Sequence, residues 1–321
     1  MTTNSNEAVA VKQVEKKRDG FMKDLFRRMI REKPLGTFGL GVVIILLFAG
    51  IFANWIAPFG MKQIDLINRL QGSSPQHWLG TDQLGRDEMS QIIFGARISL
   101  IIGLSATAIH TTISFLIGAT SAFVGGKADL IVQRFIDVWM TIPQMAILLT
   151  IVNILPRSML TIIMVLGITG GIGGARGVRS NVFWVKGYPY VSAAEAIGSK
   201  RMRTLMVHVL PNIMSVMIIG FTIGIGGAIM AESGLSFLGM GLEPGIPSWG
   251  AMINGGGQQY LQTMPALALY PGAALSLTIY GINMFGDGLR DLLDPRLRGG
   301  IGRYALSDKK LKQLKEKLAK E

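Results

Sequence analysis

The sequence contains no cysteine, little charge and only three histidines. Without cysteine the chain has no disulfide, no thiolate metal ligand and no cysteine nucleophile. The histidines lie far apart, and no HExxH or similar spacing occurs. Charged residues make up 16% of the chain, whereas soluble domains carry roughly 25%. The composition therefore disfavours a soluble domain, and we expect no metal site.

The sequence also lacks a nucleotide-binding loop of the GxxxxGK[ST] type, so we expect the chain to bind no ATP of its own. The glycine-rich stretch Gly167–Gly177 (GITGGIGGARG) has no such lysine, and we interpret it as a surface for close helix packing, like the pair Gly220 and Gly224. No paired carboxylates and no Ser/His/Asp arrangement emerge. Nothing here supports an enzyme, and we expect no cofactor on this chain.

Long apolar runs are what the sequence has in abundance, since 49% of its residues are hydrophobic. A transmembrane helix needs roughly 20 apolar residues, and six runs approach that length. Pro143 and Pro271 are expected to kink their helices. The pattern predicts an all-α integral membrane protein with six transmembrane helices. We place them near residues 36–57, 98–124, 135–155, 159–175, 213–238 and 264–287.

The distribution of Lys and Arg predicts the orientation in the membrane. With the N-terminus inside, the cytoplasmic segments hold 27 of the 32 Lys and Arg residues, and residues 239–263 hold none. This agrees with the positive-inside rule, so both termini are predicted to be cytoplasmic. The net charge of +12 then reflects topology and contact with anionic lipid rather than nucleic acid.

The segment before the first span has the pattern of an amphipathic helix. In FMKDLFRRMIREK the apolar residues share one helical face, which predicts a helix lying along the inner leaflet; a solvated basic tail is the alternative. The leader is too long for a cleaved signal peptide. The predicted division is a cytoplasmic leader (1–35), the first span (36–57), an extracytoplasmic segment (58–97), a five-helix core (98–290) that includes a cytoplasmic loop (176–211), and a basic cytoplasmic tail (291–321).

Charged side chains at membrane depth are costly and are functional candidates by default. Asp137 has Arg134 one turn before it, and an interfacial or paired role is as open here as a substrate role. The same alternatives apply to Glu232. Asp287 and Arg290, with Asp291, Asp294 and Arg296, are interpreted as a charge network that fixes the exit of the sixth span. His110, inside the second span, is expected to hydrogen-bond a neighbouring helix.

The stretch YVSAAEAIGSKRMRTLMVHVLP (Tyr190–Pro211) is small and basic between two apolar runs. From Val191 to Ile197 its residues have little bulk, so another protein could approach the backbone closely. Gly198 interrupts the helix at a cost of roughly 1 kcal/mol relative to Ala. Physical chemistry alone leaves a docking element and an ordinary amphipathic surface helix equally open.

This stretch resembles the EAA loop of membrane subunits of ABC importers, with Ala193, Ala194, Gly198, Leu210 and Pro211 at matching positions. Ser192 stands where that loop usually has Glu, Glu195 follows three residues later, and His208 replaces the usual Ile. Further segments resemble the C-type permease of oligopeptide and dipeptide importers. They are HWLGTDQLGRDEMSQIIFGARISL (His77–Leu100), RFIDVWMTIP (Arg134–Pro143), ESGLSFLGMGLEPGIPSWGAMI (Glu232–Ile253) and FGDGLRDLLDPRLRG (Phe285–Gly299).

The resemblance implies a type I ABC importer permease in a bacterial inner membrane. Its partners would be a homologous B-type permease, two cytoplasmic ATPases that carry ATP and Mg, an extracytoplasmic peptide-binding protein and a peptide substrate. The loop would be a coupling helix seated in the ATPase. The implied ATPase-coupling residues are Tyr190, Val191, Ala193, Ala194, Glu195, Ala196, Gly198, Lys200, Arg201, Arg203, Leu210 and Pro211.

The resemblance also implies an outer gate or a docking surface for the binding protein. For the first six of these residues we favour a structural cap of the second span over direct contact with the peptide, and an aromatic membrane anchor is the alternative for Trp249. The candidates are Gly80, Thr81, Asp82, Gly85, Arg86, Asp87, Phe237 and Trp249.

Three other functions remain open at this point. An importer of nickel or another small solute shares these permease motifs. An ion-coupled secondary carrier would show paired ionisable groups near the midplane and an inverted repeat, and neither is clear. A membrane-embedded enzyme would need a catalytic pair that the sequence does not show.

Overall fold

The computed structural model describes residues 21–293, and within them every regular element is helical, with one isolated bridge between Thr81 and Asp87. Two of the elements are single turns of other helix types. The elements are α2 (Phe21–Glu32), α3 (Pro34–Ile51), α4 (Ala53–Ile56), the 3-10 turn η1 (Leu66–Asn68), α5 (Glu88–Val124), α6 (Gly126–Thr141), α7 (Gln144–Ile154), α8 (Met159–Lys186), α9 (Pro189–Ala196), α10 (Arg201–Thr204), the π-helical turn η2 (Leu205–Val209), α11 (Leu210–Phe237), α12 (Trp249–Tyr260) and α13 (Ala266–Leu293).

The all-α membrane fold is confirmed. The number of helices that are long and apolar enough to cross a membrane is smaller than the predicted six among the described residues. Four helical runs are long and apolar enough to cross a membrane: α3, α5, α8 and the continuous run from α10 to α11. The pair α6 and α7 makes a fifth if it counts as one broken span. Helix α13 falls short of that apolarity, although its 28 residues give a length of about 42 Å.

The predicted third span (135–155) is not one helix, because α6 and α7 meet at an angle of 83°. Pro143 lies between them, and Ile142 before it is extended. Proline has no N–H to donate and disfavours helical geometry in the residue before it, so the chain breaks here rather than bends slightly. Pro271, in contrast, lies inside α13 without ending it.

Two helices run beyond their predicted spans. Helix α5 begins at Glu88 rather than near residue 98, and α8 continues past residue 175 to Lys186. Hydropathy marks the part of a helix that suits lipid, not the point where its backbone hydrogen bonds end. Arg176 and Arg179 therefore lie on the last turns of α8 rather than in the predicted loop 176–211.

Helices α5 and α8 form the central pair, and glycines let them approach closely. A Cβ on Gly118 of α5 would collide with the carbonyl oxygen of Ala175, and one on Gly171 of α8 would lie 2.8 Å from Ile113. The packing role predicted for Gly167–Gly177 is thereby confirmed for Gly171, whereas a Cβ on Gly173 or Gly177 would meet nothing within 4 Å. Gly224 is also close to a neighbour, Thr107 of α5, whereas a Cβ on Gly220 would meet nothing within 4 Å.

The leader helix exists as α2, and part of its apolar face packs on protein. Met29 is only 2% exposed and packs against Leu289 and Leu292 at the end of α13. Lys33 pairs with Asp291 at 2.5 Å, so Asp291 belongs to a contact with the leader. Asp294 and Arg296 of the predicted charge network lie outside the described residues. Phe26, exposed by about half, remains available to lipid.

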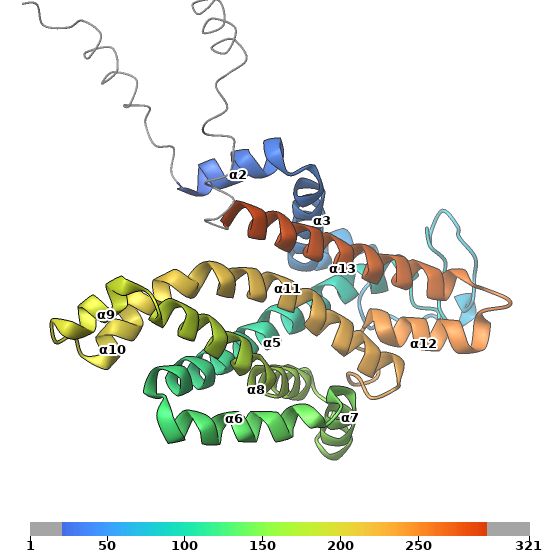
Figure 1. The fold of residues 1–321 in the computed structure, drawn as a ribbon. Coiled ribbons are helices and arrows are strands. Elements are labelled where there is room, and N and C mark those ends of the chain that lie inside the picture. The colour runs from blue at the N-terminus through green and yellow to red at the C-terminus, as the bar shows by residue number, and fades with distance from the viewer. Residues whose placement is uncertain (1–20, 294–321) are drawn as a thin grey trace, which may run out of the picture.

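The elements predicted to face the cytoplasm gather at one end of the bundle. In Figure 1, α9 and α10 lie at the left, on the same side as the C-terminal end of α13 and α2. The segment between α4 and α5 and the helix α12 lie at the opposite end. The alternation of ends predicted from charge therefore agrees with the arrangement of the helices.

Candidate functional site

The tip of the molecule that links α8 to α11 is built around one buried valine. Val191 of α9 is fully buried, between Val185 of α8 and Val209 of η2. Ala122 and Phe123 at the end of α5 complete the same cluster. Because three long helices contribute to it, the tip is fixed to the membrane helices rather than hanging from them. We call Pro189–Thr204 the coupling tip.

Helix α9 has an inner and an outer face, and this divides the predicted contact residues. Val191 and Ala194, one turn apart, are buried at 0% and 7% exposure, so they hold the tip on the bundle. Ala193 and Ala196 are exposed, and Ile197 at the end of the helix is 87% exposed. The expectation that Val191 and Ala194 offer a surface to another protein needs correction. The outward surface belongs to the other small residues.

Gly198 ends α9 with a Schellman motif. Its N–H donates to the Glu195 carbonyl at 3.0 Å, and the Ser199 N–H donates to the Ala194 carbonyl at 3.1 Å. This closure needs a left-handed residue after the helix, and Gly198 has a φ of +85°. Glycine adopts that conformation without steric cost, so the role of Gly198 is geometric.

Pro211 explains the π-helical turn η2 before α11. A proline at this position removes one helical hydrogen bond and crowds the carbonyl four residues earlier. The preceding turn widens, so that the Leu210 N–H donates to the Leu205 carbonyl. Single π turns of this kind are frequent at functional sites. Leu210 is half-buried and Pro211 is exposed.

The outer surface of the coupling tip is basic and apolar together. Lys200, Arg201 and Arg203 are all exposed, and Glu195 on α9 is exposed too. Met202 between the two arginines is 64% exposed. A water-facing tip with this much apolar area is typical of a contact surface.

Tyr190 lies at the start of α9 with part of its ring covered. Its ring stacks on that of Tyr188 with centroids 5.7 Å apart, and burial raises the pKa of its phenol. The phenol therefore stays neutral at neutral pH.

Two ion pairs tie α6 to the end of α8. Asp137 pairs with Arg134 at 3.4 Å, as predicted, and also with Arg176. Asp129 receives two hydrogen bonds from Arg179, at 2.7 and 2.6 Å. Sequence reasoning missed the second pair, because it placed Arg179 in a loop and Asp129 before a span. The charge of Asp129, spaced two helical turns from Asp137, was the available signal.

Asp87 and Asp82 organise the outer segment. Asp87 is the N-cap of α5: its carboxylate accepts from the Ser90 N–H at 2.8 Å. Asp82 accepts from the backbone N–H of Arg86 at 2.9 Å and from its Nε at 2.7 Å. Thr81 is fully buried and accepts from the Gln71 N–H. The geometry supports the capping interpretation; an outer gate or docking role for these residues stays a prediction.

Gly80 and Gly85 are both turn glycines with positive φ, at +85° and +74°. A Cβ on Gly85 would also collide with the Asp65 carbonyl. In the GTDxxGRD pattern, the two glycines therefore allow the turns, and the two aspartates accept the hydrogen bonds that hold these turns in place.

Glu232 and Trp249 lie inside the protein at the outer end. Glu232 is fully buried and accepts from the hydroxyls of Ser236 at 2.6 Å and Ser248 at 2.8 Å, which fixes the loop before α12. Trp249 is 2% exposed, and its Nε1 donates to the Ile92 carbonyl at 3.1 Å. A ring buried in this way offers no docking surface and no membrane anchor, so both expectations for Trp249 need correction. Phe237 is 40% exposed.

The remaining charged candidates are at the other end of α13. Asp287 and Arg290 are both exposed on this helix. Within residues 21–293 neither side chain makes an ion pair. Their predicted part in a charge network has no support among the described residues.

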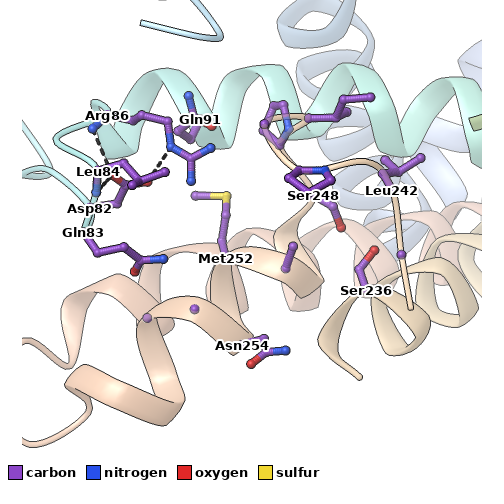
Figure 2. Close-up of a pocket in the computed structure, with 18 of the residues that line it drawn as sticks. Asp82, Gln83, Leu84, Arg86, Gln91, Ser236, Leu242, Ser248, Met252 and Asn254 are labelled. Atoms are coloured by element: carbon purple, nitrogen blue, oxygen red, sulfur yellow. Dashed lines mark hydrogen bonds and ion pairs between the residues drawn. The ribbon is translucent and has the colours of Figure 1, made fainter. Parts of the chain in front are cut away.

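Two cavities between the described helices are larger than a third, of about 180 Å³. The first, of about 390 Å³, lies at the outer end between the start of α5 and the 239–256 region. Figure 2 shows Asp82, Arg86 and Gln91 on one side of it and Ser236, Leu242 and Ser248 on the other. The second cavity, of about 560 Å³, is lined by α5, α6, α7, α8 and α11.

His110 lines the second cavity together with Trp139 and Gln144. A Cβ on Gly170 would approach its Nδ1 to 2.6 Å, so the glycine makes room for the ring. No residue in 21–293 hydrogen-bonds this imidazole, contrary to expectation.

Comparison with known proteins assigns the family. Residues 111–299 match the model of the binding-protein-dependent transport system inner membrane component, and residues 20–72 match that of the N-terminal transmembrane domain of oligopeptide transport permease C. The chain is 35% identical over 292 residues to the oligopeptide transport system permease protein OppC of Bacillus subtilis (strain 168), covering 89% of this chain and 93% of the relative.

Two further relatives show similar coverage. The dipeptide transport system permease protein DppC of the same organism is 36% identical over 278 residues, 87% of each chain. The glutathione transport system permease protein GsiD of Escherichia coli O6:K15:H31 (strain 536 / UPEC) is 36% identical over 277 residues, 86% of this chain and 91% of the relative. The chain belongs to the family of binding-protein-dependent transport system inner membrane components.

Proposed function

We propose that the chain is the permease subunit of an ATP-driven importer of short peptides, and that it forms half of the translocation pathway. The names of its relatives, which concern oligopeptides, dipeptides and glutathione, support a peptide cargo rather than nickel. A homologous permease would complete the pathway. An extracytoplasmic binding protein would deliver the peptide at the end where α12 lies.

The observation that carries the proposal is the two-sided build of the coupling tip. Its inner face is fixed to α5, α8 and η2 through Val191, while Ala193, Ala196 and Ile197 face outward. A partner that pushes on the outer face would move α8 and α11 with it, because the inner face is packed tightly against these helices. Two cytoplasmic ATPases, which carry the ATP and Mg, would be that partner, and the termini would share their side of the membrane.

The coupling can be tested by purifying the tagged full-length chain from gently solubilised native membranes and identifying the proteins that come with it. Ala193→Arg puts a long cation on the outer face. We expect this variant to keep the second permease and to lose the ATPases. Gln262→Arg is the control, since Gln262 is exposed at the opposite end and does not line the cavity there, and this variant should keep both.

Ala194→Arg serves as a comparison that distinguishes a loss of ATPase binding from a loss of folding. Because Ala194 is buried, the arginine would disturb the tip itself and lower the melting temperature of the chain, which Ala193→Arg should leave unchanged. A wild-type chain that purifies alone, or ATPases that stay bound to Ala193→Arg, would contradict the proposal. The first result would favour an ion-coupled carrier.

A further inference from the structure

Two residues that line the outer cavity each carry a buried oxygen atom without a hydrogen-bond partner. Glu88 and Gln91 both line this cavity, and each is 2% exposed. The Oε1 atom of Glu88 and the Oε1 atom of Gln91 accept no hydrogen bond. Leaving a buried acceptor unpaired is costly, and more so for a charged group, so this pair calls for an explanation.

The Glu88 and Gln91 side chains lie on the same face of α5. They are three residues apart at the start of the helix, a spacing that places them one above the other. The Gln91 amide is held from its other end, because its Nε2 donates to the Met61 carbonyl at 2.9 Å. Its oxygen is therefore the end left for a partner.

The two neighbouring aspartates, Asp82 and Asp87, are already occupied. The Asp82 carboxylate accepts from Leu84, from the Arg86 backbone and from the Arg86 side chain. Asp87 accepts from Ser90 and contacts His77 at 2.9 Å. Glu88 is the buried carboxyl group among the residues lining this cavity that has an oxygen without a hydrogen bond.

The electrostatic balance favours a positive ligand. Of the charged residues that line the cavity, the exposed Glu243 and Arg157 balance each other. The buried Asp82 and Glu88 then stand against Arg86, which Asp82 already binds through its Nε. The start of a helix carries a partial positive charge that favours anions, but it amounts to about half a unit and is outweighed by the additional carboxylate. Two acceptor oxygens beside excess negative charge suit a cationic N–H donor.

We propose that the outer cavity binds the terminal ammonium group of a short peptide, which donates to the Glu88 carboxylate and to the Gln91 amide oxygen. The cavity volume of about 390 Å³ is in the range of small-ligand sites, roughly 300–1,000 Å³. The inference rests on the proposed function for the identity of the ligand, but its geometry is independent of it. The site would hold the amino end of the peptide at the outer end of this subunit.

The test compares dialanine with N-acetyl-dialanine, which lacks the ammonium group. Binding of each is measured by calorimetry to the complex that co-purifies with the full-length chain, in nanodiscs and without the binding protein. We expect dialanine to bind the wild-type complex more tightly than its acetylated form. Glu88→Gln should weaken dialanine binding roughly tenfold and leave the acetylated form unchanged.

Two further variants guard against an effect on folding. Glu88→Asp keeps the charge and should retain the preference for dialanine. Glu243→Gln removes a carboxylate that lines the same cavity but is exposed, and it should change neither affinity.

Equal binding of the two peptides, unchanged in Glu88→Gln, would overturn this inference while leaving peptide import intact. A Glu88→Gln variant that binds dialanine normally but loses affinity for the binding protein would also overturn it, in favour of a lysine of that protein. A complex that neither binds nor imports any peptide would instead refute the proposed function.

Discussion

Gly198 decides where α9 ends, and its contribution is conformational. An added Cβ would meet nothing within 4 Å, so crowding plays no part, but φ is +85°. A side chain in the left-handed region costs about 1–2 kcal/mol. The closure of the coupling tip therefore depends on one residue that contacts almost nothing.

Gly198→Ala should destabilise the tip by about 1–2 kcal/mol, measured by hydrogen exchange of the α9 amides. Gly220→Ala is the matched control, because its Cβ also meets nothing within 4 Å but its backbone is helical. That substitution should be neutral or slightly stabilising. Equal effects of the two substitutions would contradict a conformational role.

Trp249 has a structural role at the outer end. Trp249→Phe removes the indole hydrogen bond to the Ile92 carbonyl and opens space beside Gly95, where a Cβ would approach the indole to 2.7 Å. We expect a loss of about 1–3 kcal/mol, seen as a lower melting temperature of the purified chain. Trp55→Phe, at an 80% exposed position, should have almost no effect. A larger loss of stability in Trp55→Phe than in Trp249→Phe would contradict the structural role of Trp249.

At the scale of elements, two ion pairs join α6 to α8. Asp129 and Arg179 are largely buried and make two hydrogen bonds, so their pairing should be stronger than that of a surface pair. This pair fixes the start of α6 on the last turns of α8, next to the coupling tip.

A double-mutant cycle with Asp129→Asn and Arg179→Gln should give a coupling energy of about 0.5–3 kcal/mol in thermal unfolding. Either single change leaves one partner unpaired, and the double change removes both. The pair Arg28–Glu32 on α2, exposed by 30% and 51%, is the control and should give about 0.5 kcal/mol or less. Strict additivity at Asp129 and Arg179 would show that α6 is held by other contacts.

The sequence predicts these elements well where burial in lipid dictates composition. The apolar runs of α3, α5, α8 and α11 follow from the need to satisfy a hydrocarbon environment. Helix ends outside the bilayer carry no such signal, which is why the polar last turns of α8 and the first turns of α5 were predicted as loop. Pro143 predicted a kink, but its 83° break depends on tertiary packing of α7.

The candidate sites show the same division. The resemblance to the EAA loop implies a coupling tip, yet only tertiary contacts reveal that Ala194 faces inward and Ala193 outward. The pair Glu88 and Gln91 has a helical spacing, but that spacing is common and says nothing about unpaired oxygens. Which face of an element is buried is a property of its neighbours, and the neighbours are far apart in the chain.

At the scale of the whole molecule, we propose that the chain acts as a lever between the outer peptide site and the contact surface of the coupling tip. Helices α5, α8 and α11 extend from the coupling tip towards the outer end, and α5 carries both Phe123 beside the tip and Glu88 at the outer cavity. Rigid helices that share a packed core move together, so a displacement of the coupling tip should also displace the residues that line the outer cavity.

The most direct measurement of this claim is uptake of a labelled dipeptide into proteoliposomes that contain the complete complex. We predict that uptake requires ATP on the tip side and binding protein on the opposite side. Ala193→Arg should abolish this uptake, and Gln262→Arg should preserve it. Uptake that proceeds without ATP, driven by a proton or sodium gradient and unaffected by Ala193→Arg, would contradict the account.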